Sequence, residues 1–162
     1  MKTLLILRHA KSSWKNMNLS DHERPLNKRG KRDAPRMGTL LAEKNLTPNL
    51  IITSSAERAL TTAESVALNS GYEQEIVVTR NLYHGDPENY LDVLRERGEP
   101  HACVMVVGHN PGMEALVEDL TGTYQRMPTA TLVQVELHLD SWTDFTEGVT
   151  GDLIDLWRPK EL

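Results

Sequence analysis

Three segments of the sequence place cationic or imidazole side chains within a few residues of the end of a short apolar run. Arg8 and His9 follow the first of these runs, Arg58 follows another and His109 follows a third. Short, continuous apolar runs are typical of strands buried on both faces of a parallel sheet. Ligands of open α/β sheets bind at the carboxyl ends of such strands, so we expect these side chains to converge on one pocket.

The types of these side chains suit a dianionic phosphoryl group. Guanidinium groups match the planar equatorial oxygens of a phosphoryl group in its transition state, and an imidazole can act as a nucleophile. Arg58 lies in the first turn of an expected helix, whose N-terminal N–H groups also favour an anion, helped by Ser54 and Ser55. We therefore expect His9 to attack a phosphoryl group that Arg8 holds.

These residues lie in four ordered segments, which read LRHAK at 7–11, RPLNKRG at 24–30, SSAERALTTA at 54–63 and VGHNP at 107–111. Together the segments resemble the successive blocks of the phosphoglycerate-mutase-like histidine phosphatase superfamily, and within it the small SixA-type phosphohistidine phosphatases. The resemblance extends from Thr3 to about Leu139. It implies a metal-independent phosphatase in which His9 becomes phosphorylated during turnover.

The same resemblance implies roles for further residues. Arg8 and Arg58 would clamp the phosphate, and His109 would be a second imidazole that bonds the phosphoryl oxygens. Arg24 would line the entrance, and Lys11 is either a further phosphate contact or a solvated charge. The resulting candidates for substrate binding are Arg24, Ser54 and Lys11.

The chain departs from the family where a leaving group would be protonated. Larger members carry a glutamate or aspartate after the third strand, whereas residues 80–84 contain no carboxylate, and the candidates nearby are His84, Asp86 and Glu88. An alkoxide that leaves unprotonated is about as poor as hydroxide, whose parent water has a pKa of ~15.7. An imidazole nitrogen has a conjugate-acid pKa of ~6.5. A site without a strong acid therefore suits P–N bonds.

Two classes of function follow from these features. The preferred function is dephosphorylation of phosphohistidine on a protein, with a small-molecule phosphomonoesterase as the enzymatic alternative. The other class is a non-catalytic module that binds phosphorylated ligands, and the intact His9 argues against it. The expected partner is a phosphorylated protein or a small phosphorylated molecule. The sequence carries no feature that indicates an oligomer and is compatible with a monomer.

Composition excludes several other classes. No two of the six histidines stand at i, i+3 or i, i+4 spacing with a carboxylate partner, and neighbouring arginines would repel a cation, so no metal or cofactor is expected. The net charge of −5 disfavours nucleic acid and acidic membranes as partners. No apolar segment approaches ~18 residues, so no membrane span is expected. The single cysteine, Cys103, is expected to be buried and inert, and a cytoplasmic location is the default.

Alternating strands and helices must position these groups. Strands are expected at 4–7, 50–53, 76–78 and 103–107, helices at 27–44, 56–69, 88–97 and 113–120, and two final, edge-like antiparallel strands at 131–139 and 152–157. The aperiodic segment 12–22 is an expected loop in which Trp14 folds over the site. The pattern predicts an α/β fold, a three-layer α/β/α sandwich with a mixed, mostly parallel central sheet, as one domain over 1–162.

Overall fold

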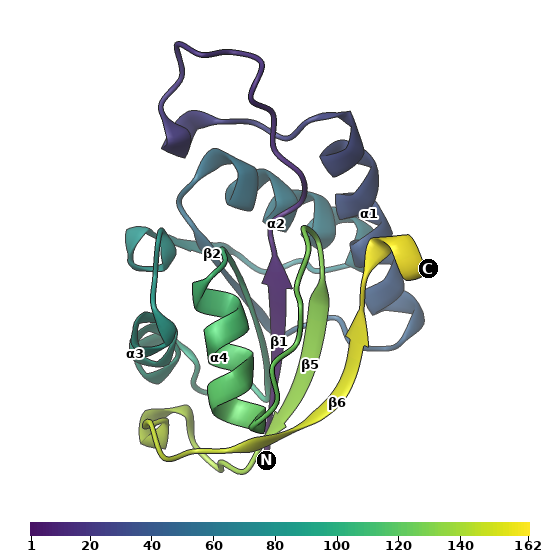
Figure 1. Cartoon of the computed structure of the whole chain (residues 1–162). Coiled ribbons are helices and arrows are strands. Elements are labelled where there is room, and N and C mark those ends of the chain that lie inside the picture. The colour runs from purple at the N-terminus through teal and green to yellow at the C-terminus, as the bar shows by residue number, and fades with distance from the viewer.

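The computed structural model describes the whole chain, residues 1–162, as a six-stranded sheet between two layers of helices (Figure 1). The strands are β1 (Lys2–Arg8), β2 (Leu50–Ser54), β3 (Ile76–Thr79), β4 (Cys103–Gly108), β5 (Leu132–Leu137) and β6 (Gly151–Trp157). The helices are α1 (Lys28–Glu43), α2 (Glu57–Ser70), α3 (Pro87–Arg97) and α4 (Gly112–Thr121). Their order along the chain follows the order expected from the sequence.

The sheet is mixed and mostly parallel, with the strand order β3-β2-β4-β1-β5-β6. The strands β3, β2, β4 and β1 pair in parallel, whereas β5 and β6 join antiparallel. Successive residues of β1 point to opposite faces, so Leu4 packs in the core beside α3 and α4 while Leu5 packs in the core beside α1 and α2. Both faces are covered, which confirms the expected three-layer sandwich.

The position of β5 differs from the expectation of an edge-like strand. It pairs with β1 on one side and with β6 on the other, so β6 forms this edge of the sheet. The alternation of buried apolar residues with the half-buried Gln134 and Glu136 indicates that one face of the strand is better covered than the other. It does not indicate whether both edges of the strand are hydrogen-bonded, because that depends on where β6 lies in the sheet.

The register of the central strands brings the polar groups together. β1 and β4 pair with Arg8 opposite Gly108, so His9 and His109 leave the sheet side by side. β2 lies next to β4 with Thr53 opposite Val107, which places the start of α2 at the same end of the sheet. The convergence expected at the carboxyl ends of the parallel strands is therefore a consequence of strand order and register.

Local interactions fix α1 and α2 around this end of the sheet. Asn27 caps α1, since its Oδ1 accepts the Gly30 N–H at 2.9 Å. Gly30 packs so closely on the loop after β1 that a Cβ atom there would overlap the Lys11 carbonyl. At the far end of α2, Gly71 has a φ of +81°, a left-handed conformation that glycine adopts without a steric penalty.

Cys103 is half-buried, not fully buried as expected, because it is the first residue of β4. Burial raises the pKa of its thiol to about 11, so the thiol stays protonated at neutral pH. None of the helices is long and apolar enough to cross a membrane.

Candidate active site

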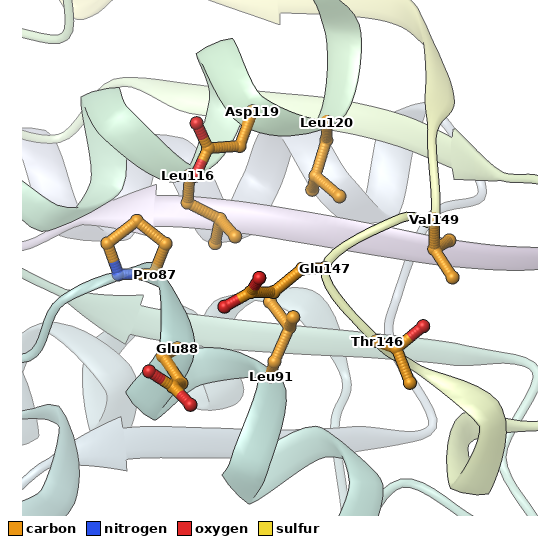
Figure 2. Close-up of a pocket in the computed structure, with 9 residues that line it drawn as sticks. All are labelled: Pro87, Glu88, Leu91, Leu116, Asp119, Leu120, Thr146, Glu147 and Val149. Atoms are coloured by element: carbon orange, nitrogen blue, oxygen red, sulfur yellow. The ribbon is translucent and has the colours of Figure 1, made fainter.

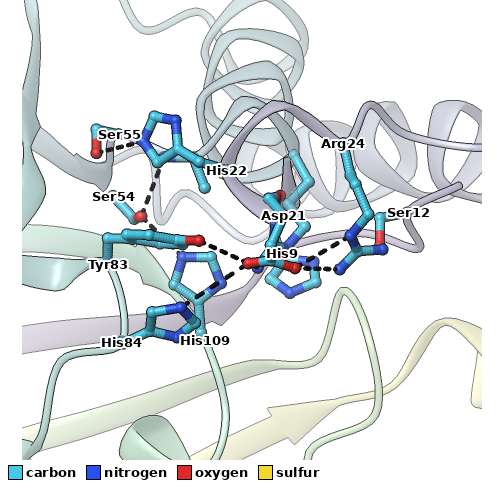
Figure 3. Close-up of polar contacts among 12 residues, drawn as sticks. His9, Ser12, Asp21, His22, Arg24, Ser54, Ser55, Tyr83, His84 and His109 are labelled. Carbon is cyan, nitrogen blue, oxygen red and sulfur yellow. Dashed lines mark hydrogen bonds and ion pairs between the residues drawn. The ribbon is translucent and has the colours of Figure 1, made fainter. Parts of the chain in front are cut away.

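A polar cavity of about 290 Å³ lies at the carboxyl ends of β1 and β4. The sequence-predicted site residues that line it are Arg8, His9, Lys11, Arg24, Arg58 and His109. Figure 3 shows the side chains around it and their polar contacts. The cavity is also lined by residues without a predicted role in binding or catalysis, namely Ser12, Trp14, Asp21, Asn110 and Thr129.

His9 is held in one orientation by its own backbone. Its Nδ1 lies 2.8 Å from the carbonyl oxygen of Ala10, and the Ala10 N–H donates to Thr62 Oγ1 at 3.0 Å. A carbonyl oxygen can only accept, so in the neutral ring Nδ1 carries the proton and Nε2 carries the lone pair. The nitrogen with the lone pair is the one that can attack an electrophile.

The surroundings of His9 keep its imidazole neutral. The residue is 6% exposed. Burial above all, together with the guanidinium groups of Arg8, Arg58 and Arg24, lowers the pKa of His9 from 6.5 to about 3. The hydrogen bond to Ala10 opposes this effect without reversing it. The imidazole of His9 therefore remains neutral well below neutral pH.

His109 is also buried and neutral, and its ring centroid lies 5.0 Å from that of His9. Burial, followed by the positive charge that His9 would carry and by Arg58, lowers the pKa of His109 to about 3. Its Nε2 lies 2.7 Å from Ser54 Oγ, which also accepts the Ala56 N–H at 3.3 Å. If the Ser54 hydroxyl donates to His109 Nε2, the other ring nitrogen carries the proton and can bond an anion.

Ser54 itself does not line the cavity, contrary to the expectation that it binds substrate. It is fully buried as the last residue of β2, behind His109. Of the first turn of α2, only the Arg58 side chain reaches the cavity. Ser55, which precedes the helix, pairs instead with His22, since its Oγ lies 2.9 Å from His22 Nε2. The serines expected to help bind an anion therefore support neighbouring histidines.

Asp21 is the principal site residue that the sequence reasoning missed. Its Oδ1 accepts from Arg24 Nε and Nη2 at 3.1 and 3.0 Å, and its Oδ2 accepts from Arg58 Nη2 at 3.1 Å and from the Tyr83 hydroxyl at 2.7 Å. Its backbone carbonyl accepts from Arg58 Nη1 at 2.7 Å. Burial opposes its ionisation, but the bonds from Tyr83, Arg58 and Arg24 outweigh burial and hold the pKa of Asp21 well below its ordinary value. Asp21 is thus an anion that orients two arginines.

The loop before α1 covers Arg24 and leaves the cavity open. The Trp14 ring lies over the Arg24 guanidinium, whose Cζ is 3.5 Å from the ring centroid, and Arg24 Nη1 donates to Ser12 Oγ at 2.7 Å. Trp14 nevertheless remains 71% exposed. Lys11 is an exposed residue of the cavity wall. Trp14 therefore folds over one arginine at the rim, not over the site as a whole.

The three candidates for a proton donor lie in different places. His84 lines the cavity. Asp86 is the N-cap of α3, in a capping box with Asn89. Glu88 faces a separate cavity of about 410 Å³ between α3, α4 and residues 146–149, whose floor includes Leu91 and Leu116 (Figure 2). Only the histidine is thus in reach of a ligand bound at His9.

The sequence of this chain is similar to those of known proteins. The sequence model of the histidine phosphatase superfamily (branch 1) matches residues 4–84. An uncharacterized chloroplastic protein of Arabidopsis thaliana is 30% identical over 152 residues, which cover 88% of this chain and 70% of that protein. An uncharacterized protein of Mycobacterium leprae is 30% identical over 120 residues, which cover 72% of each chain.

Solved structures extend the similarity to the whole fold. The structure assigned as the phosphohistidine phosphatase SixA of Agrobacterium tumefaciens has a TM-score of 0.83 and 28% identity, covering 98% of both chains. A protein histidine phosphatase SixA complexed with tungstate also has a TM-score of 0.83, with 23% identity over 98% of both chains. The fold is therefore that of the SixA-type structures.

Proposed function

Because this chain belongs to the histidine phosphatase superfamily, we propose that it is a metal-independent phosphatase that removes phosphoryl groups from phosphohistidine on a protein. The observation that carries the proposal is the state of His9, a buried neutral imidazole with Nδ1 bonded to a carbonyl and Nε2 left with its lone pair. His9 Nε2 attacks phosphorus, the P–N bond of the substrate breaks, and water then hydrolyses phospho-His9 to inorganic phosphate.

The cationic groups around His9 support a phosphoryl substrate. The half-buried Arg8 and the buried Arg58 place two guanidinium groups beside it, and the buried Nε atoms of both have no hydrogen-bond partner within the protein. The same is true of His109 Nδ1. Buried donors without a partner are costly, so an anion bound among them recovers this cost and is held more tightly as charge develops on its oxygens.

The acid–base character of the cavity supports a P–N bond over an alkyl ester. Its only carboxylate, Asp21, is ionised and already accepts from Arg24, Arg58 and Tyr83, so it has no proton for an alkoxide. Once its other ring nitrogen carries a proton, the imidazole of phosphohistidine leaves as a neutral group and is a far better leaving group than an alkoxide. No group of three or more His, Cys, Asp or Glu side chains is arranged to hold a metal ion that could replace a proton donor.

The rim of the cavity supports a protein as the carrier of the phosphohistidine. Trp14 at the rim is 71% exposed, and Met17 in the same loop is 93% exposed. Exposed aromatic and methionine side chains are enriched at surfaces that bind proteins. A side chain projecting from a partner protein can therefore enter a cavity whose rim contacts the surrounding surface.

Trapping the phosphoenzyme tests the proposal. The wild-type protein is mixed in chelator with a ³²P-phosphohistidine peptide and quenched in alkali, and we expect acid-labile label on His9. His9→Asn keeps an N–H for the Ala10 carbonyl but has no nucleophile, so it should take up no label. His138→Asn is the matched control, since His138 pairs with Asp152 on the surface.

Each alternative has its own outcome in this experiment. Faster labelling by glycerol phosphate than by the peptide would replace the proposed substrate with a small phosphoester. Tight binding of the peptide without label or phosphate release would identify a binding module. Label retained by His9→Asn would refute the covalent mechanism.

A further inference from the structure

A phosphohistidine side chain needs a proton to leave as neutral imidazole. When the P–N bond breaks, its electron pair stays on the leaving nitrogen. Unless the other ring nitrogen carries a proton, the product is an imidazolate anion, which is a poor leaving group. Phenolates and alkoxides have the same requirement, and it grows as the pKa of the leaving group rises.

Most titratable groups of the cavity cannot supply this proton at neutral pH. The arginines and Lys11 hold their protons too tightly. Asp21 is ionised, and each of its oxygens already accepts two hydrogen bonds. His9 is the nucleophile, and burial keeps His109 neutral with a pKa of about 3. The one titratable group of the cavity wall that is left is His84.

The structure aims His84 into the cavity from the loop between β3 and α3. Its ring stacks on Tyr83 with 4.0 Å between centroids, and its centroid lies 6.3 Å from that of His109. Its Nε2 lies 3.8 Å from Asp21 Oδ2, so a protonated ring faces a carboxylate (Figure 3). Asp21, Tyr83 and His109 are the titratable groups that face it. Its side chain is 67% exposed, so it can exchange protons with water.

The backbone of His84 adds an independent observation. Its φ is +57°, in the left-handed region that non-glycine residues rarely adopt. The following residue, Gly85, could adopt that conformation without strain, yet the histidine does so. Backbone strain of this kind clusters at active sites and ligand-binding sites.

We infer, on the basis of the proposed function, that His84 is the acid that protonates the leaving group and the base of the second step. As His9 Nε2 bonds to phosphorus, the P–N bond breaks, and the proton from His84 on the other ring nitrogen makes the product neutral imidazole. Neutral His84 then takes a proton from the water that attacks phospho-His9. This transfer restores both histidines and releases inorganic phosphate.

Two aryl phosphates separate this role from a structural one. Nitrophenyl phosphate releases a stable anion that needs no proton, whereas phenyl phosphate releases a phenolate whose pKa is about 10, as for tyrosine. The rate of His9 phosphorylation is measured for both in single turnovers, so that chemistry alone is observed. His84→Asn is the test variant, because Asn tolerates the left-handed backbone and carries no acidic proton. His138→Asn is the matched control.

We expect His84→Asn to phosphorylate His9 from phenyl phosphate, and from a phosphohistidine peptide, about 100-fold more slowly or worse, since general acids contribute 10²–10⁴-fold. The rate with nitrophenyl phosphate should change less than about threefold. The ratio of the nitrophenyl rate to the phenyl rate should therefore be at least about 30-fold higher in His84→Asn than in the wild type. His84→Asp should recover part of the phenyl phosphate rate at pH 5.5.

The failures of the two proposals differ. Equal losses on both aryl phosphates, or no loss on either, would overturn the role of His84 and leave the phosphatase standing. A wild-type protein that phosphorylates His9 from no substrate would overturn the proposed function and the role of His84 with it.

Discussion

Acidification tests the electrostatics of the cavity directly. Burial, Arg8, Arg58 and Arg24 lower the pKa of His9 from 6.5 to about 3. At pH 5, an imidazole with the ordinary pKa is ~3% neutral, whereas one with a pKa of ~3 is ~99% neutral, a difference of about 30-fold in the neutral form. The neutral form of His9, which the proposed mechanism requires, should therefore persist through mildly acidic solution.

NMR of ¹³C-labelled histidine measures this without interference from ionisation of the substrate. Of the six imidazole signals, those of His9 and His109 should not titrate between pH 8 and 4.5, because both pKa values lie near 3. His9→Asn assigns the first signal by its disappearance. A midpoint for His9 above pH 5 would show that water or a counter-charge reaches the ring, and would refute the account of its neutrality.

Four further outcomes are expected. Arg58→Lys cannot reproduce both of its bonds to Asp21, so kcat/KM should fall at least ~30-fold in a phosphatase assay, about 2 kcal/mol, and an unchanged value would place Arg58 outside the reaction. Asp21→Asn should lower the free energy of unfolding in urea by only about 1 kcal/mol, since the carboxylate is 39% exposed, although it leaves a buried guanidinium unpaired. Gly30→Ala should cost about 1–3 kcal/mol in the same measurement, because its Cβ would meet backbone, whereas Gly148→Ala, with no atom within 4 Å, should be neutral. His9 and His109 have pKa values in the folded protein below 6.5, so the unfolded chain binds more protons than the folded one in acid. The free energy of unfolding should therefore decrease as the pH is lowered from 6.5 towards 3, by on the order of 2 kcal/mol per histidine at pH 5. Equal urea midpoints at pH 7 and pH 5 would contradict this.

Local sequence determines the buried strands, the helix caps and the positions of several site residues. Continuous apolar runs identify the buried strands whatever the rest of the chain does, because both faces of a parallel strand must be covered. Arg8, His9 and His109 directly follow such runs, and in this fold the carboxyl ends of the parallel strands meet at one edge of the sheet. The position of these side chains, and the caps at Asn27 and Gly71, could therefore be predicted.

Other features depend on contacts between residues that lie far apart in the sequence, and the hydrophobic pattern of the sequence does not predict such contacts. Asp21 comes from an aperiodic polar segment and is separated from Arg58 by 37 residues and from Tyr83 by 62. Only the path of the folded chain brings its carboxylate to both, so that it accepts a hydrogen bond from each. Ser54 is the last residue of one strand and His84 lies in the loop after another, yet Ser54 lies behind His109 whereas His84 faces the cavity. Side-chain direction at the end of a strand is set by packing against neighbouring elements and by the backbone angles of the loop. The residues able to do chemistry could thus be predicted from the sequence, whereas tertiary structure decided which of them line the cavity and which support their neighbours.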